Sequence, residues 1–347
     1  MRNPLSKTIE QIKPSGIRKF FDIVSEMPHA ISLGVGEPDF DTPWHVRSEG
    51  IRSLEKGRTF YTSNSGLIEL RQEICKWYQR KYNVLYDYKT EALLTVGGSE
   101  GIDVALRAML DPGDEVIIPE PCYVSYVPCV QLIGAVPVTI ELKNENQFRL
   151  TPEELLAAIT DKTKILILAF PSNPTGAVMT KEDLEPIAKI CQEKDIYVIS
   201  DEIYSELTYG GQKHCSISSL PGMKERTIVI NGFSKAYAMT GWRLGYALAP
   251  EVIAHQMTKI HQFAIMCAPT TSQYAAIEAI KNGDADIEKM CKSYDQRRRF
   301  LLKKFEEIGL PCFEPHGAFY VFPCIKEFGI TSDEFATRLL REEELAV

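Results

Sequence analysis

A short stretch in the second half of the chain combines three side chains with complementary chemistry. Residues 234–243 read Ser-Lys-Ala-Tyr-Ala-Met-Thr-Gly-Trp-Arg and follow a β-branched run. The amine of Lys235 can form a Schiff base with a carbonyl compound. The hydroxyl of Ser234 and the guanidinium of Arg243 can hold a phosphate. A cofactor with one aldehyde and one phosphate, such as pyridoxal phosphate, would use all three side chains. For this stretch alone, an exposed lysine and arginine on a loop and helix start explain the pattern equally well.

Three further strand ends carry polar or glycine-rich groups. Gly98 and Ser99 stand at a helix start, where backbone N–H groups and the helix dipole favour an anion. Asn173 belongs to a Ser-Asn-Pro-Thr-Gly turn, and Asp201 follows another apolar run. A carboxylate there can cap a helix or face a protonated ring nitrogen. Ligands of open α/β sheets bind beyond the carboxyl ends of the strands, so four such junctions favour one shared site.

The elements that must position these groups alternate along the chain. Short apolar runs alternate with helical patterns, which is typical of a mostly parallel sheet with helices on both faces. Capping boxes at Thr151 and Thr180 mark two helix starts. Seven strands are expected at 92–96, 115–118, 135–140, 164–170, 196–200, 227–231 and 244–248. The helices between them are expected near 99–110, 122–133, 152–159 and 181–194.

The two chain ends differ from this alternating middle. The N-terminal residues are irregular and rich in proline and glycine. The last part is expected to form a long charged helix, a strand-like piece and another helix, at 284–309, 317–323 and 331–343. We therefore expect an α/β protein with two domains. Residues 46–283 would form the large domain, and the two chain ends, 1–45 and 284–347, would form a smaller α/β domain.

Composition excludes several classes of function. The chain has 347 residues, 44% of them hydrophobic and 25% charged, as in globular proteins. A net charge of −8 without a basic block argues against a nucleic-acid partner. No apolar run is long enough for a membrane span, and no apolar signal core begins the chain, so we expect a cytoplasmic protein. Nine scattered cysteines indicate reduced thiols, and six histidines without a cluster predict no metal site.

The chain resembles the fold-type-I pyridoxal-phosphate enzymes of the class I/II aminotransferase family, in its bacterial aspartate, aromatic and alanine-type subgroup. The resemblance covers nearly the whole length. Five motifs carry it in order: Ser-Leu-Gly-Val-Gly-Glu-Pro-Asp-Phe at 32–40, Tyr61 with Gly66 and Glu69-Leu70-Arg71, Ser-Asn-Pro-Thr-Gly at 172–176, Asp-Glu-Ile-Tyr at 201–204, and Ser-Lys with Gly-Trp-Arg at 234–243. It implies ping-pong transfer of an amino group from an L-amino acid to a 2-oxo acid.

The resemblance also implies roles around the cofactor ring. Lys235 would hold the cofactor as an imine and then move the proton between substrate and cofactor. Asp201 would keep the pyridine nitrogen protonated, which makes the ring an electron sink. Asn173 and Tyr204 would hydrogen-bond the phenolic oxygen. Tyr123 would stack on the ring face, with core packing as its alternative.

The remaining implied roles concern the phosphate, the substrate and a second subunit. Tyr61 would reach the phosphate of a neighbouring subunit, which implies a homodimer with shared active sites, although a bond within its own chain is the alternative. Glu100 is a further candidate for the cofactor site, and its alternative is a charge on the helix surface. Gly36 would contact the substrate carboxylate through its backbone, beside Asn173. The expected phosphate ligands are Gly98, Ser99, Ser234 and Arg243.

One family feature has no candidate. The family clamps the substrate carboxylate with an arginine that should come after Leu345-Ala346-Val347, where the sequence stops. We therefore expect the C-terminal end, a few dozen residues, to be lacking. Arg338 and Arg341 have the pattern of solvated helix charges.

The amino donor is only weakly indicated. Related aspartate enzymes often carry a lysine at the position of Ser99, and its absence removes one partner for a dicarboxylate. With Phe40, Trp44 and Phe319 expected near the pocket, we favour aromatic, alanine-type or broad-range donors.

Three alternatives remain at this stage. A carbon–sulfur lyase or cyclopropane-forming synthase can use the same motifs around Lys235. A non-catalytic cofactor-binding module of a transcription regulator ranks far lower, because residues 1–30 are too short and mixed in charge for a basic helix-turn-helix. A dinucleotide-dependent dehydrogenase is poorly supported, because no strand is followed by Gly-x-Gly-x-x-Gly.

Overall fold

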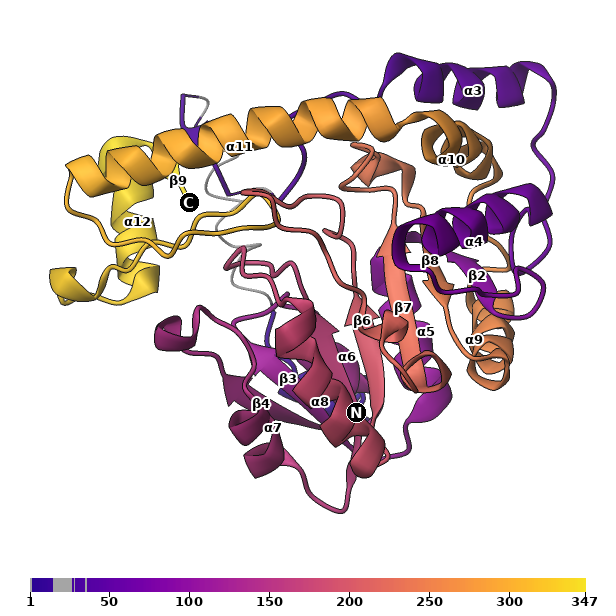
Figure 1. The fold of residues 1–347 in the computed structure, drawn as a ribbon, viewed down its shortest axis with the longest axis horizontal. Coiled ribbons are helices and arrows are strands. Elements are labelled where there is room, and N and C mark those ends of the chain that lie inside the picture. Colours follow the sequence, from indigo (N-terminus) through magenta and orange to yellow (C-terminus); the bar gives the residue numbers. More distant parts are fainter. Residues whose placement is uncertain (1, 15–26, 28, 35) are drawn as a thin grey trace.

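The centre of the molecule is a seven-stranded sheet. The computed structural model describes residues 2–14, 27, 29–34 and 36–347. The strand order is β2-β8-β7-β6-β5-β3-β4 (Figure 1). Strands β2 to β8 comprise Ala92–Thr95, Glu115–Glu120, Val136–Glu141, Thr163–Ala169, Tyr197–Asp201, Thr227–Gly232 and Gly245–Leu248. The predicted α/β class with a mostly parallel seven-stranded sheet is thereby confirmed.

One strand runs against the others. β8 pairs antiparallel with both β2 and β7, while the remaining neighbours pair in parallel. β8 therefore begins at the edge of the sheet where the other six strands end. Arg243 lies two residues before β8, so this direction brings its guanidinium to the same edge as Asp201 and Lys235.

Helices cover both faces of the sheet. Within β6, Ile199 packs in the apolar cluster that includes α5 and α9, whereas the next-door Val198 packs in the cluster that includes α8. This alternation follows from the period of two residues in a strand. The helices are α1 Lys7–Gln11, α3 Trp44–Glu55, α4 Ile68–Tyr82, α5 Gly97–Met109, α6 Tyr126–Leu132, α7 Pro152–Ala158, α8 Lys181–Glu193, α9 Glu251–Ala264, α10 Thr270–Asn282, α11 Asp284–Glu307 and α12 Ser332–Glu343.

Both predicted capping boxes are present. The Thr151 side chain accepts a hydrogen bond from the Glu154 N–H, and the Glu154 side chain returns one to the Thr151 N–H. Thr180 and Asp183 make the same reciprocal pair at the start of α8. These side chains satisfy N–H groups that a helix start leaves unpaired.

The predicted strand at 317–323 is wrong. Among the described residues this piece makes only isolated bridges, Thr208 with Gly317 and Cys312 with Pro323. Pro315 and Pro323 lack the N–H that a continuous ladder needs. The C-terminal part consists of the long helix α11, which crosses the top of Figure 1, followed by irregular chain and α12. The short strand β9, Leu345–Ala346, then pairs in parallel with β1, Ile31–Ser32.

The irregular chain after α11 rests on the Ser-Asn-Pro-Thr-Gly turn. The N–H groups of His316 and Gly317 both donate to the Gly176 carbonyl, at 3.0 and 2.9 Å. Gly176 has a φ of +73°, and a Cβ there would lie 2.4 Å from the Pro315 Cβ. Only glycine fits this contact. Residues 315–320 are therefore held at the carboxyl edge of the sheet.

Candidate active site

A cavity of about 670 Å³ opens at the carboxyl edge of the sheet. It collects residues from several strand ends and from loops far apart in the sequence, such as those of Gly36 and Tyr320. Most of the sequence-predicted site residues line it, namely Gly36, Gly98, Ser99, Tyr123, Asn173, Asp201, Tyr204, Ser234, Lys235 and Arg243. The tertiary structure thus brings these ten positions together around one space.

Lys235 provides the reactive amine of the cavity. Its Nζ donates a hydrogen bond to the carbonyl of Gly36. Burial lowers the pKa of the Lys235 amine, and the nearby Arg243 guanidinium lowers it further, while Glu37 and Asp201 act in the opposite direction. A lysine with a lowered pKa carries less charge near neutral pH and is a better nucleophile.

Asp201 ends β6 at the bottom of the cavity. Its Oδ2 accepts a hydrogen bond from the Tyr126 hydroxyl at 2.7 Å, and its Oδ1 accepts one from the Ile203 N–H at 3.2 Å. Burial raises the pKa of this carboxyl, while both hydrogen bonds lower it. The site therefore removes the carboxylate from water but supplies donors that favour its ionised form, as required of a partner for a cation.

The start of α5 and the chain before β8 form a cup for an anion. Gly97 has a φ of +74°, and a Cβ there would lie 2.6 Å from Nη2 of Arg243. A Cβ on Gly245 would lie 2.6 Å from the Gly97 carbonyl carbon. Glycine at both positions lets the helix start approach the guanidinium, with the buried Ser234 beside them. These groups fit a phosphate.

Two phenols meet close to Lys235. The hydroxyls of Tyr204 and Tyr320 lie 2.7 Å apart. The Lys235 Nζ is 5.8 Å from the centre of the Tyr204 ring and 5.6 Å from that of Phe319. Phe319 therefore lies near the site, although it does not line the cavity.

Sequence reasoning missed Tyr126 and Tyr320. Tyr126 follows Tyr123 by three residues, and the two rings pack edge to face at 5.7 Å. That spacing was a usable signal, because it places both side chains on one side of a turn or helix. Tyr320 gave no such signal, since its place depends on how residues 315–320 dock on the sheet edge.

Several expectations require correction. Glu100 does not line the cavity, and it is not a surface charge. It is partly buried, with one carboxylate oxygen bonded to the Val96 N–H and the other 2.6 Å from Nδ1 of the fully buried His261. Trp44 is 65% exposed and does not line the cavity. Phe40 does not line it either, but it lies near the site as expected, because it packs against the apolar cluster that includes Tyr204, with its ring centre 5.3 Å from that of Tyr294. The Glu100 side chain therefore stabilises the start of α5.

Tyr61 also lies outside this cavity. Its side chain is 79% exposed, beside Phe60 at 80%. Arg338 and Arg341 are exposed on α12, as the sequence predicted. Along the described ranges, no helix has the length and apolar character needed to cross a membrane.

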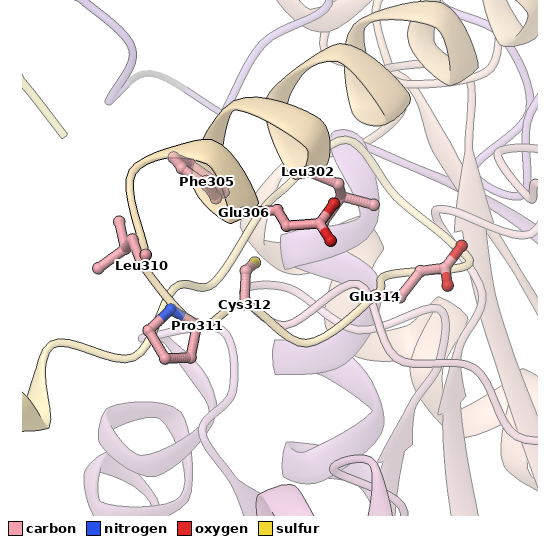
Figure 2. Close-up of a pocket in the computed structure, with 8 residues that line it drawn as sticks. Leu302, Phe305, Glu306, Leu310, Pro311, Cys312 and Glu314 are labelled. Carbon is pink, nitrogen blue, oxygen red and sulfur yellow. The ribbon is translucent and has the colours of Figure 1, made fainter.

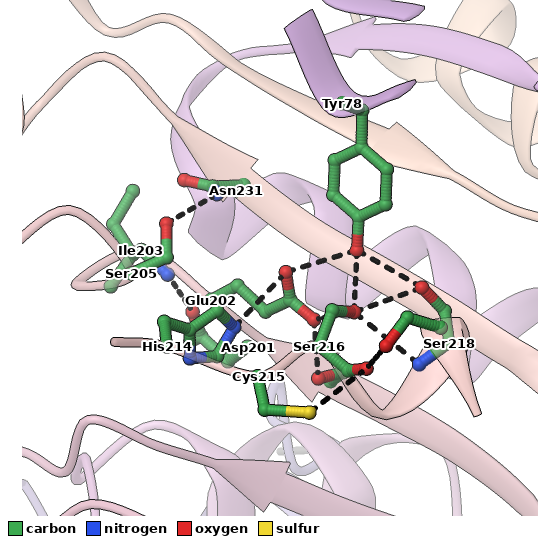
Figure 3. A network of polar contacts seen from close by, with 12 residues as sticks. Tyr78, Asp201, Glu202, Ile203, Ser205, His214, Cys215, Ser216, Ser218 and Asn231 are labelled. Atoms are coloured by element: carbon green, nitrogen blue, oxygen red, sulfur yellow. Dashed lines mark hydrogen bonds and ion pairs between the residues drawn. The ribbon is translucent and has the colours of Figure 1, made fainter. Parts of the chain in front are cut away.

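A buried polar network supports the chain just behind Asp201 (Figure 3). Glu202 is fully buried and accepts hydrogen bonds from the hydroxyls of Ser200, Ser216 and Tyr78, at 3.0, 2.5 and 3.1 Å. Nε2 of the buried His214 lies 3.4 Å from the same carboxylate. A buried carboxylate with this many donors fixes the backbone that carries Asp201 and Tyr204.

A second cavity, of about 460 Å³, lies at the C-terminal end of α11 (Figure 2). Leu302, Phe305, Leu310 and Cys312 line much of it, together with Glu306 and Glu314. It holds no lysine or arginine and none of the predicted site residues. The chemistry of the molecule is therefore concentrated at the sheet edge.

Comparison with known proteins identifies the class. The family model "Aminotransferase class I and II" matches residues 28–347. An aspartate aminotransferase of Pyrococcus abyssi is 46% identical over 99% of this chain and 89% of its own length. An aromatic-amino-acid aminotransferase of Thermococcus litoralis is 44% identical over the same shares. The solved structure of Thermus thermophilus aspartate aminotransferase with maleate is 37% identical, covers 100% of this chain and 91% of its own, and has a TM-score of 0.95.

The fold and the cavity are those of a fold-type-I pyridoxal-phosphate enzyme. This chain belongs to the class I and II aminotransferase family, as its motifs predicted. It is a pyridoxal-phosphate-dependent aminotransferase that moves an amino group from an L-amino acid to a 2-oxo acid. The aminotransferase assignment is better supported than a lyase, a regulatory module or a dehydrogenase, because the named relatives are aminotransferases over nearly the full chain.

Removing the donor to Asp201 should change the pH dependence of the enzyme. In Tyr126→Phe, burial of Asp201 continues to raise its pKa while the opposing hydrogen bond from Tyr126 is lost, so the pKa rises further. The ionised carboxylate is present above this pKa and is lost as the pH falls through it. The acid limb of the kcat/KM profile should therefore move to higher pH.

Tyr237→Phe is the matched control. The Tyr237 hydroxyl is buried and has no hydrogen-bond partner among the described residues. An unchanged acid limb in Tyr126→Phe, or an equal shift in Tyr237→Phe, would contradict the role assigned to Tyr126.

Proposed function

We propose that the cavity holds pyridoxal phosphate with Lys235 as its covalent partner. The supporting observation is that the Lys235 amine shares one cavity with the buried Asp201 carboxylate and with the Arg243 guanidinium. When bound, the cofactor withdraws electrons from the substrate Cα. Asp201 would keep a proton on the pyridine nitrogen, and Tyr204 and Asn173 would hydrogen-bond the phenolic oxygen.

Lys235 is proposed to move the proton during transfer. Burial lowers the pKa of its amine, which favours the uncharged form that can accept a proton. Its hydrogen bond to the Gly36 carbonyl points it toward the segment expected to contact the substrate carboxylate. Proton acceptor and substrate contact then lie on the same side of the cavity.

The phosphate is proposed to bind in the cup made by Gly98, Ser99, Ser234 and Arg243. The helix start offers N–H groups, and the guanidinium lies next to Gly97. Tyr123, which lines the same cavity, is proposed to stack on the ring. Glu100 supports the helix start through its bond to the Val96 N–H.

We further propose an amino donor with an aromatic, alanine-type or otherwise uncharged side chain. Among the described residues that line the cavity, Lys235 and Arg243 are the only lysine or arginine side chains, and both already have roles. Tyr320 and Val124 contribute uncharged surface instead. An aspartate side chain would bury its carboxylate without a cation.

A homodimer is proposed from the surface that carries Tyr61. Phe60, Tyr61 and Phe263 are 80%, 79% and 82% exposed, which favours cover by a second copy. The Thr270 hydroxyl donates to the Phe60 carbonyl at 2.8 Å, which ties this loop to α10. Tyr61 would then reach the phosphate of the partner.

Two coarser assignments complete the proposal. Residues 46–283 would form the large cofactor-binding domain, and 1–45 with 284–347 the smaller one, with the contacts of Gly176 joining them. A limited-proteolysis map with cuts inside these ranges rather than near their bounds would contradict the division. All nine cysteines are unpaired, which supports a reducing compartment such as the cytoplasm. Immunolocalisation outside the cytoplasm would contradict that placement.

Lys235→Ala should lose the visible absorption of the cofactor-loaded protein, because no amine remains to form the imine. The measurement is an absorption spectrum taken after incubation with the cofactor and removal of the unbound part, since the free aldehyde also absorbs. Lys224→Ala is the control, since Lys224 pairs with Glu91 away from the cavity and should keep the band. A band that survives in Lys235→Ala would assign the cofactor to another lysine.

The donor preference can be read from the first half-reaction. We expect kcat/KM for tyrosine or alanine to exceed that for aspartate by about tenfold or more, since a buried, unpaired carboxylate is unfavourable. Ser99→Lys should raise the value for aspartate, because it places a cation in the cavity. The proposal is wrong if the unmodified protein prefers aspartate, which would favour the activity named for the Pyrococcus abyssi relative.

Subunit sharing can be tested by mixing inactive chains. Lys235→Ala and Tyr61→Ala chains should regain part of the activity after subunit exchange, because one site of each hybrid dimer has both native residues. Lys235→Ala mixed with Arg243→Ala is the matched control and should regain none, since both residues serve the same chain's site. Activity equal to the mean of the separate samples would exclude shared sites.

A further inference from the structure

Tyr320 lines the cavity and reaches it from outside the sheet. It belongs to the irregular chain that follows α11, whereas Tyr204 follows β6. Their hydroxyls lie 2.7 Å apart, and their rings meet edge to face with centres 5.8 Å apart. No motif of the sequence analysis included Tyr320. This hydroxyl pair is the direct polar link between the C-terminal part of the chain and the predicted ring-binding residues.

The position of Tyr320 is fixed from two sides. The Ala318 N–H donates to the Leu207 carbonyl at 2.9 Å, and the Tyr209 hydroxyl donates to the Ala318 carbonyl at 2.5 Å. On the cavity side, a Cβ on Gly36 would lie 2.6 Å from the Tyr320 hydroxyl oxygen. The phenol is therefore confined between Tyr204 and the backbone that accepts from Lys235.

The direction of the hydrogen bond follows from counting protons. A phenol has one proton to donate. Tyr204 uses its proton on the phenolic oxygen of the cofactor if the proposed function is right. Tyr320 must then be the donor in the pair, and Tyr204 the acceptor. A donor that is itself hydrogen-bonded in this way becomes a stronger donor, because the bonds polarise one another.

We propose that Tyr320 is a positioning residue that acts on the cofactor through Tyr204. Its hydroxyl donates to the Tyr204 oxygen and so strengthens the hydrogen bond that Tyr204 gives to the negative phenolic oxygen. The C-terminal segment thereby sets the proton affinity of the nitrogen that joins Lys235 to the cofactor. The inference rests on the role of Tyr204 in the proposed function.

The other titratable and charged groups around this pair are not altered chemically by removing the Tyr320 hydroxyl. Burial raises the pKa of Tyr204, followed by the effects of Tyr320 and of the Asp201 carboxylate, and Tyr123 lies near both phenols. Around Lys235 the charged neighbours are Glu37, Arg243 and Asp201. A phenylalanine at 320 changes none of these charges, so any shift reports on the lost hydroxyl.

The experiment is an absorption titration of the cofactor-loaded protein without substrate. Its readout is the pH midpoint at which the Lys235-linked nitrogen loses its proton. Loss of that proton leaves the phenolic negative charge without an adjacent positive nitrogen, so hydrogen bonds to that oxygen favour the deprotonated form. Tyr320→Phe should therefore raise the midpoint, by about 0.5 pH unit. Tyr204→Phe should raise it more.

A double variant tests whether Tyr320 acts through Tyr204. In the Tyr204→Phe background, Tyr320→Phe should give no further shift. Tyr209→Phe is the matched control, because it removes another phenol that holds the same segment at Ala318, yet it does not line the cavity. Its midpoint should equal that of the unmodified protein. These four results together would support the inference.

Each contrary outcome overturns it. A lowered midpoint in Tyr320→Phe would mean that Tyr204 donates to Tyr320. An unchanged midpoint in Tyr320→Phe would mean that Tyr320 has no effect on the Lys235-linked nitrogen. A shift that persists in the absence of the Tyr204 hydroxyl would mean that Tyr320 acts directly on the cofactor. An equal shift in Tyr209→Phe would reduce Tyr320 to segment packing. Failure of the proposed function looks different: Tyr204→Phe itself would then leave the midpoint unmoved, or the band would survive in Lys235→Ala.

Discussion

The structure depends on keeping an amine and a carboxylate out of water at one edge of a sheet. Lys235 and Asp201 are both shielded from solvent, which lowers the pKa of the first and raises that of the second. Isolated charges in such a place are strongly unfavourable. The fold offsets this with the Gly36 carbonyl for the amine and with the Tyr126 hydroxyl and Ile203 N–H for the carboxylate. The hydrogen-bond partners that allow these two groups to be buried therefore belong to the same arrangement that prepares them for catalysis.

The surrounding shell explains why so many buried polar groups lie behind the site. Glu202, next to Asp201 in sequence, faces the opposite way into a cluster of hydroxyls with His214. Glu100 and His261 form a similar buried pair that stabilises the start of α5. Neither carboxylate has a place in the cavity. Each carboxylate instead holds a turn next to a residue that lines the cavity. Buried polar pairs behind the cavity wall therefore fix the positions of the residues that line it.

Much of the architecture and chemistry could be predicted from local pattern. Seven apolar runs separated by helical periods suffice for a covered, mostly parallel sheet, since strands buried on both faces must be apolar throughout. The Thr151 and Thr180 capping boxes are local by nature and appear as expected. Lys235, Asp201, Asn173 and Gly98 were found because each follows a strand, and parallel strands end at a common edge. The local pattern failed at 317–323, where a short apolar run suggested a strand, but within the described chain the piece makes only isolated bridges and is flanked by Pro315 and ends at Pro323.

By itself, the sequence determined the class of fold, the family and ten of the positions that line the cavity, because these depend on residue type, on short motifs and on short-range period. Only the tertiary structure decided the direction of β8, which carries Arg243 to the shared edge. It alone turned Glu100 away from the cavity and brought Tyr320 to Tyr204 across 116 positions of sequence. Such contacts are set by how distant segments dock, through backbone bonds such as those of Gly176, and no short window of residues encodes them.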